Sequence, residues 1–183
     1  MPIIIGDAIG SDLNDPLGLL TDCHRRIEKF ATILHTLAEQ DVGDNLDAER
    51  REALRVSLRY FRESAPKHKA DEEESLFPRL LARGCEIAGM LDVLNSDHRS
   101  FDDSHKQVEE LGRSWLANDS LKSIEATRLR MILIDMREKY ARHIGIEETH
   151  VFPMAGRILP PEELQAIANE MAQRRGLEAS SRR

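Results

Sequence analysis

Apolar residues recur every three or four positions along most of the chain, which is the spacing of one face of an α-helix. The first such stripe follows Asp15-Pro16, which is typical of a helix cap with proline at the first helical position. Its members are Leu19, Leu20, Cys23, Ile27, Phe30, Leu34 and Leu37. Gly43 stops the pattern, so the sequence predicts a first long helix between Asp15 and Gly43.

A second helical pattern opens at Asp47 and continues to about Gly84. Its apolar stripe includes Leu54, Leu58 and Phe61. Pro66 lies inside this pattern. Because proline lacks a backbone N–H and its ring clashes with the preceding turn, we expect a kink or a short break near Ser64–Pro66.

Two further long patterns follow. The third runs from about Ile87 to Leu116, and Asn118-Asp119-Ser120 is a turn and cap signal after it. The fourth begins at Leu121 and is broken by Leu159-Pro160-Pro161, which also starts a short fifth helix. Gly176 ends that last helix.

Long amphipathic helices joined by short connections predict an all-α fold, most simply an up-down-up-down four-helix bundle with a short additional C-terminal helix. No strand pattern competes with this prediction. A chain of 183 residues is most simply one domain. We expect an N-terminal arm at 1–14, the bundle at 15–159, and the short C-terminal helix and tail at 160–183.

Composition supports a helix-rich protein with an aliphatic core, since 32% of residues are charged and only 4% are aromatic. The formal net charge of −7 argues against a nucleic-acid partner and against an anionic membrane surface. The two cysteines, Cys23 and Cys85, form no CxxC motif. Together with an N-terminal stretch too short for a signal sequence, they favour the reducing cytoplasm.

One motif occurs twice, at His68–Pro78 and at His143–Pro153. In each copy a histidine is followed four residues later by Glu-Glu, and then by Phe-Pro. Side chains four residues apart lie about 40° apart around a helix, so the histidine and the first glutamate share one face. An imidazole and a carboxylate pointing the same way form half of a site for a first-row transition metal.

His24 and His98 lie in the other two long helices. If the helices alternate in direction, these residues meet the two repeated motifs at one level of the bundle. Four imidazoles and two carboxylates suit iron, manganese or zinc. Two octahedral metals need about 12 bonds, of which the side chains supply about 8 and a shared bridge about 2. About 2 positions therefore remain for a small ligand, which is typical of a reactive or binding site.

These motifs resemble the hemerythrin-like (HHE) cation-binding domains over roughly Asp15 to Ile158. That family has a His on helix 1, His-x-x-x-Glu on helix 2, a His on helix 3 and His-x-x-x-Glu on helix 4, often with a following Phe-Pro step. The resemblance implies a non-haem di-iron centre, with two iron ions bridged by carboxylates and by an oxo or hydroxo group, and with manganese or zinc as substitutes. Its metal ligands would be His24, His68, Glu72, His98, His143 and Glu147.

The sequence departs from the oxygen-carrying hemerythrins at one position. Those proteins have a fifth histidine ligand four residues after the helix 3 histidine, and that slot is Asp102 here. Reversible oxygen transport is therefore disfavoured, and sensing, redox chemistry and iron handling stay open. Three roles are open for Asp102: it ligates a metal, it holds a metal-bound water, or it does neither. Glu28, four residues after His24, is ambiguous in the same way.

The remaining polar residues favour simpler interpretations. His35, His105 and His150 return to the ligand faces, but they lie about 10–17 Å from the site level, so we expect polar groups near the bundle ends. A ferritin-like register built on Glu147-x-x-His150 and Asp102-x-x-His105 leaves the four other histidines without a role. Glu73 and Glu148 point about 140° from their histidines, toward the surface or toward outer contacts with the site.

Three more features have predicted roles. Tyr140 lies one turn before His143, and it either hydrogen-bonds a metal-bound ligand or places a wet hydroxyl at the bundle edge. Cys23 turns about 100° from the metal face and reads as a small packing residue. Phe77 and Phe152 are expected in the core, Pro78 and Pro153 should bend their helices, and the basic run at Arg174-Arg175 is expected to be solvated.

The sequence thus favours a metal-binding protein that binds or senses dioxygen, nitric oxide, peroxide or the iron or redox state, rather than a dedicated enzyme. The alternative is a di-iron oxidoreductase or peroxide-consuming enzyme that uses the same centre. A metal-free interaction bundle leaves the repeated motif unexplained. The expected partner is a small diatomic ligand or peroxide, with no protein partner identified, and the expected assembly is a monomer or homodimer.

Overall fold

A computed structural model describes residues 14–40, 46–84 and 86–177, and it is helical with no strand in those ranges. The first rod of the bundle is α1 (Pro16–Gln40). The second joins α2 (Ala48–Glu63), α3 (Ala65–Ala70), the π-helix η1 (Asp71–Leu76) and α4 (Phe77–Ala82). The third is α5 (Ala88–Asn118). The fourth joins α6 (Ser123–Ile146), the π-helix η2 (Glu147–Val151) and α7 (Phe152–Ile158), and α8 (Pro161–Arg174) follows it.

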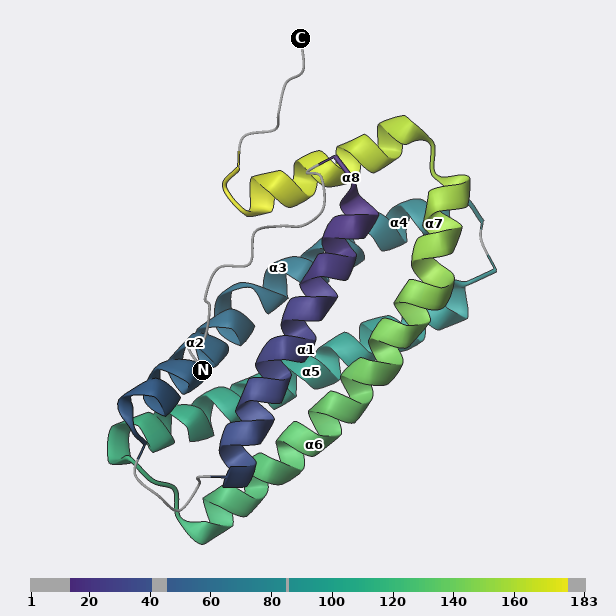
Figure 1. Ribbon diagram of the computed structural model, residues 1–183. Helices are drawn as coiled ribbons and strands as arrows, with labels where there is room; N and C mark the ends of the chain where they lie inside the picture. The colour runs from purple at the N-terminus through teal and green to yellow at the C-terminus, as the bar shows by residue number, and fades with distance from the viewer. Residues whose placement is uncertain (1–13, 41–45, 85, 178–183) are drawn as a thin grey trace.

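The four rods alternate in direction, as the sequence predicts (Figure 1). The yellow helix α8 crosses the end of the bundle at which α1 begins and α4 and α7 end. It packs against α1 and η1. None of the helices in the described ranges is long and apolar enough to cross a membrane.

The helix boundaries follow from local chemistry. The backbone N–H of Gly18 donates to the Asp15 carboxylate at 3.0 Å, and that of Arg50 donates to the Asp47 carboxylate at 2.8 Å. Both caps satisfy an N–H that the first turn of a helix leaves without a partner. Asp119 has the left-handed backbone angle φ of 62° that ends α5. The predicted stop at Gly43 and the N-terminal arm up to residue 13 lie outside the described residues.

The second rod breaks at Ser64, where the sequence predicts it because of Pro66. A π-turn, which periodicity did not indicate, precedes each of the prolines at which the sequence predicts a bend, Pro78 and Pro153. In these turns the N–H of Phe77 donates to the carbonyl of Glu72, five residues earlier, and Phe152 does the same to Glu147. Five residues of α-helix turn about 140° past one full turn, so a regular helix would direct each phenylalanine away from its glutamate.

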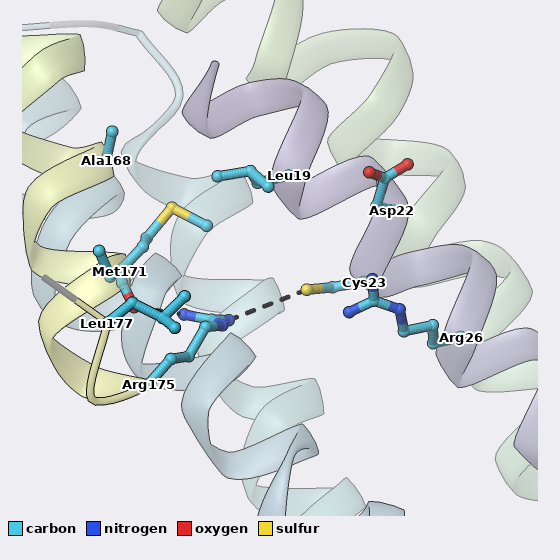
Figure 2. Close-up of a pocket in the computed structure, with 9 residues that line it drawn as sticks. Leu19, Asp22, Cys23, Arg26, Ala168, Met171, Arg175 and Leu177 are labelled. Atoms are coloured by element: carbon cyan, nitrogen blue, oxygen red, sulfur yellow. Dashed lines mark hydrogen bonds between the residues drawn. The ribbon is translucent and has the colours of Figure 1, made fainter. Parts of the chain in front are cut away.

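Helix α8 is held to the bundle by a buried carboxylate. Asp71, fully buried in η1, accepts hydrogen bonds from Arg174 at 2.9 Å and from Arg175 at 2.6 Å. Arg175 also reaches toward the thiol of Cys23 on α1, at 3.9 Å (Figure 2). The prediction that this basic run is solvated is wrong. Both guanidinium groups neutralise the carboxylate of Asp71, which the second rod places beneath α8.

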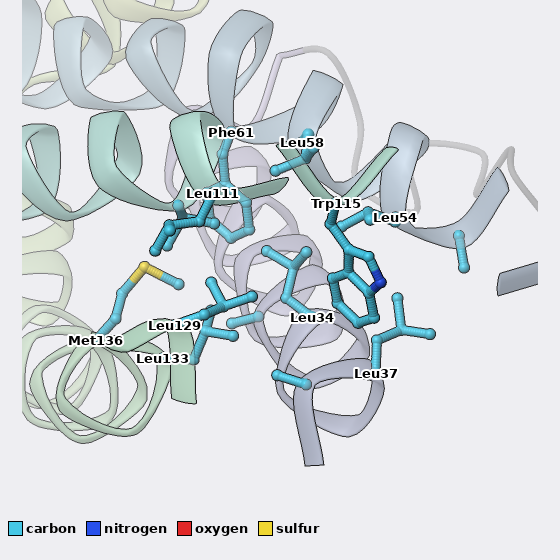
Figure 3. Packing of buried hydrophobic residues seen from close by; sticks show 14 of the residues in the cluster. Leu34, Leu37, Leu54, Leu58, Phe61, Leu111, Trp115, Leu129, Leu133 and Met136 are labelled. Atoms are coloured by element: carbon cyan, nitrogen blue, oxygen red, sulfur yellow. The ribbon is translucent and has the colours of Figure 1, made fainter. Parts of the chain in front are cut away.

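The apolar core is divided into two clusters along the bundle axis. The larger lies toward the end opposite α8, where Leu34, Leu58, Leu111, Trp115 and Leu133 face one another (Figure 3). The smaller lies beneath α8 and includes Leu20, Phe77, Leu94, Val151 and Ile167. Along α1 the change from one cluster to the other falls between Leu20 and Ile27, and His24 lies in this interval.

Candidate metal centre

The six side chains expected to be ligands meet in the layer between the two apolar clusters. His24 comes from α1, His68 and Glu72 from the second rod, His98 from α5, and His143 and Glu147 from the fourth rod. Each of the six residues is at most 5% exposed. The structure therefore brings together all of the predicted site residues, and it does so inside the bundle.

The six residues form two overlapping groups of four whose nitrogen and oxygen atoms lie within 4.8 Å of one another. Each group takes two histidines, and both groups share the two glutamates. The members of the first group are His24, His68, Glu72 and Glu147, and those of the second are Glu72, His98, His143 and Glu147.

Each carboxylate directs one oxygen toward each group. Glu72 Oε1 lies 3.2 Å from His68 Nε2, and Glu72 Oε2 lies 3.2 Å from His98 Nε2. Glu147 Oε2 lies 3.1 Å from His24 Nε2, and Glu147 Oε1 lies 3.2 Å from His143 Nε2. Neighbouring ligand atoms around a metal bonded at about 2.1 Å lie about 3.0 to 3.4 Å apart. The separations therefore fit two metals placed side by side.

Most of these atoms have no hydrogen-bond partner within the described part of the chain. His24 Nε2, His98 Nε2 and all four carboxylate oxygens of Glu72 and Glu147 are buried and unsatisfied. A buried polar atom without a partner is destabilising by about 1–3 kcal/mol, and more if charged. Six such atoms aimed at one region match the donor set that a metal needs, and the residues present fit such a group.

The first and second rods form one half of the bundle, and the third and fourth rods form the other half. The second glutamate of each repeat contacts a histidine of the half to which it does not belong. Glu148 Oε1 lies 2.8 Å from His24 Nδ1, and Glu73 Oε1 lies 2.9 Å from His98 Nδ1. A carboxylate at Nδ1 holds the proton there and leaves Nε2 free to donate its lone pair inward. Of the two placements that the sequence left open for these glutamates, the structure supports the outer contact with the site.

His143 and His68 differ from this pattern. His143 Nδ1 lies 3.5 Å from Asp97, whose carboxylate also pairs with Arg142 at 2.9 Å. His68 Nδ1 is buried without a partner among the described residues. Sequence reasoning missed Asp97, and the available signal was its position directly before His98, on a helix expected to pack against the fourth one.

In the metal-free site, three of the histidines differ widely in pKa. Burial lowers the pKa of His24, but the carboxylates of Glu147 and Glu72 outweigh this effect and raise it to about 10. The same competition, with Glu72 dominant, raises the pKa of His98 to about 9. Burial lowers the pKa of His68 to about 4. In the metal-free protein, His24 and His98 are therefore the rings that keep a proton near neutral pH.

Aromatic rings close the site on the side of α8. Phe152 stacks on His24 with ring centroids 5.3 Å apart, and Phe77 lies parallel to His98 at 6.3 Å. Both phenylalanines are buried, as predicted. The π-turns make this possible, because they bring the fifth residue after each glutamate back over the centre.

Other candidates are not brought into the centre. Asp102, in the slot of a fifth histidine, pairs with Lys69 at 2.6 Å, and Glu28 pairs with Arg25 at 2.6 Å. His150 is exposed and His35 is half-buried. The ferritin-like register therefore has no geometric support. Of the two roles predicted for Tyr140, the wet hydroxyl at the bundle edge is wrong: Tyr140 is buried, and its hydroxyl lies 2.9 Å from Nε2 of the half-buried His105.

Comparison with known proteins agrees with this geometry. The family model for the hemerythrin HHE cation-binding domain matches residues 15–172. A protein of Haemophilus influenzae described as uncharacterised is 28% identical over 167 residues, covering 88% of this chain and 91% of its own. Because the family match spans the bundle and the structure gathers its histidines and glutamates into one buried cluster, the chain belongs to the hemerythrin HHE cation-binding family.

Proposed function

We propose that the protein holds two iron ions between its four histidines and two glutamates. His24 and His68 would bind one ion, His98 and His143 the other, and Glu72 and Glu147 would bridge both. The observation that supports this proposal is the division of each carboxylate, whose two oxygens face different histidine pairs at 3.1–3.2 Å. Manganese or zinc would suit the same donor set.

Charge supports a pair of cations. Glu72 and Glu147 are fully buried, and three further carboxylates, of Glu73, Asp97 and Glu148, contact the histidines from outside. The two central carboxylates favour multivalent cations, and the outer carboxylates increase the basicity of the imidazoles. Lys69, Arg25 and Arg142 neutralise the three outer carboxylates at the rim.

The role we propose is the binding or sensing of dioxygen, nitric oxide, peroxide or the iron or redox state. Each histidine pair with one oxygen from each glutamate would supply about four of six donors per iron. A shared bridge would take one more position, so about one position per iron remains for another ligand. A di-iron group, when bound, supplies reversible ligand binding and electron transfer. The chain contributes a dry site, fixed imidazole orientation and screening by Phe77 and Phe152.

The direct test is to purify the protein without oxygen after iron-supplemented growth, count metals per chain, and record the absorption spectrum before and after air. Two irons and an oxygen-dependent charge-transfer band are expected. Glu72→Ala and Glu147→Ala should each lose at least one metal while helix content stays, and Glu138→Ala, at an exposed position of α6, is the matched control. A metal count near zero in the wild-type protein, or full loading in both glutamate variants, contradicts the proposal.

The second candidate is a peroxide-consuming oxidoreductase at the same centre. It is favoured by the fact that Tyr140 and His105, which are not expected ligands, line a cavity together with His68, His98 and His143. Multiple turnovers of hydrogen peroxide with an added reductant would support the enzyme. A stoichiometric spectral change without turnover would support the binding protein.

A further inference from the structure

A small cavity adjoins the histidine layer between the second rod, α5 and α6. Three expected ligands, His68, His98 and His143, line it together with Phe101, Tyr140 and His105. The centre of a water molecule can move within about 20 Å³ of this cavity. One water needs roughly 10–15 Å³, so the cavity holds a ligand of a few atoms and excludes an organic substrate.

Two polar pairs line the cavity besides the expected ligands: Lys69 with Asp102, and Tyr140 with His105. The Tyr140 hydroxyl lies 2.9 Å from His105 Nε2. The Tyr140 ring stacks on Phe101 with centroids 3.9 Å apart and planes at 5°, so its orientation is fixed by packing. Burial raises the pKa of Tyr140 well above its usual range and lowers that of His105 to about 4. Both groups are therefore uncharged near neutral pH.

An uncharged histidine can either donate or accept at Nε2. When His105 donates to the tyrosine oxygen, the hydroxyl proton of Tyr140 is free for a third atom. In a buried cavity of low dielectric this proton is a strong recognition element. The ammonium group of Lys69, which also lines the cavity, is already paired with Asp102. The pair is thus suited to a ligand that accepts a hydrogen bond.

A surface groove adjoins this cavity. The groove lies between α2 and α5, offers about 260 Å³, and shares Pro66, Asp102 and His105 with the cavity wall. Lys69 and Asp102, which form an ion pair at 2.6 Å, are themselves part of the cavity wall. Asp102 is therefore engaged by Lys69 in a wall that also includes His98 and His143.

We propose that this cavity is the subsite for a small exogenous ligand of two or three heavy atoms with an oxygen or nitrogen acceptor, such as peroxide or azide. Tyr140, positioned by His105, donates the hydrogen bond that holds the ligand beside His98 and His143. The inference rests on the proposed function, because the ligand needs a metal-loaded centre.

The test compares iron-loaded wild-type protein with Tyr140→Phe and with the control Tyr60→Phe. Tyr60, also largely buried, donates to the backbone carbonyl of Cys23 and is not among the residues lining the cavity. Equal iron content is established first. Azide is then titrated by absorption, and its infrared stretch is recorded in H2O and D2O. Tyr140→Phe should bind azide about 3- to 10-fold more weakly, as expected for one lost hydrogen bond.

The solvent isotope shift separates a hydrogen bond from a merely structural role. Wild type and Tyr60→Phe should show a D2O shift of the azide stretch, and Tyr140→Phe should show none. If Tyr140→Phe fails to fold or to load iron, His105→Phe should weaken azide binding and His105→Gln should restore it in part. Unchanged affinity and an unchanged isotope shift in Tyr140→Phe overturn the inference, as does a loaded wild type that binds no azide. Failure of the wild type to load metal instead contradicts the proposed function.

Discussion

The Nδ1 atom of His24 lies 2.8 Å from Oε1 of Glu148, which belongs to the opposite half of the bundle. The same relationship, with the halves exchanged, joins His98 to Glu73 at 2.9 Å. Each copy of the repeated motif thus does two things. Its first glutamate enters the centre, and its second glutamate orients a histidine that the other half supplies.

The contact between Glu148 and His24 predicts that Glu148→Gln weakens metal binding without unfolding the protein. The amide keeps the shape of the side chain but loses the charge that supports the imidazole. Loss of such a partner lowers metal affinity by about 10- to 100-fold. Competition against a chelator measures the change, and Glu138→Gln, at an exposed position of the same rod, should bind metal like the wild type. Wild-type affinity in Glu148→Gln would show that the contact does not tune the site.

The metal-free protein should lose stability as the pH rises from about 6.5 to 9. His24 faces Glu72, Glu147, Glu148 and His68, and its pKa is raised to about 10. A histidine whose pKa is higher in the folded than in the unfolded protein stabilises the fold when it is protonated. This stabilisation is complete below the unfolded pKa of about 6.5, and it is lost as the pH rises toward the folded pKa. His98, with a pKa of about 9, acts in the same direction.

Urea unfolding of chelator-treated protein at several pH values measures this dependence. In a His24→Gln variant the decline should be shallower, because one of the two protonated rings is gone. Metal affinity should rise over the same interval, since binding must displace the protons. A free energy of unfolding that increases between pH 6.5 and 9 would contradict the assignment of these protons.

Much of the fold and the cluster follows from local rules in the sequence. Asp15 and Asp47 mark helix starts because a carboxylate next to free N–H groups acts at short range. The repeated His-x-x-x-Glu spacing places donors on one face for the same local reason. By contrast, the contacts of Asp71 and Tyr140 depend on how the rods are aligned with one another. Helical periodicity alone does not determine that alignment, so these contacts could not be predicted.

The buried carboxylate beneath α8 predicts a large effect on stability. Asp71→Ala leaves the guanidinium groups of Arg174 and Arg175 partly buried and without their main partner. Breaking a buried ion pair from one side is destabilising by about 3–5 kcal/mol. Glu163→Ala, which breaks the more exposed pair with Arg83, should change stability by at most about 1 kcal/mol. Urea unfolding compares the two, and equal effects would mean that Asp71 does not hold α8 in place.

The contact between Gly112 of α5 and Leu58 of α2 leads us to expect opposite effects when alanine replaces glycine at Gly112 and at Gly145. A Cβ atom at Gly112 would lie 2.7 Å from Leu58 Cδ1, whereas one at Gly145 meets nothing within 4 Å. Gly145→Ala should therefore stabilise the metal-free protein by about 0.5–1 kcal/mol, the usual gain in a helix. At Gly112 overpacking of about 1–3 kcal/mol outweighs that gain. Adding Leu58→Ala removes the clash, so the double variant should be less destabilised than the sum of the single changes in urea unfolding. Simple additivity would show that Leu58 moves aside without strain.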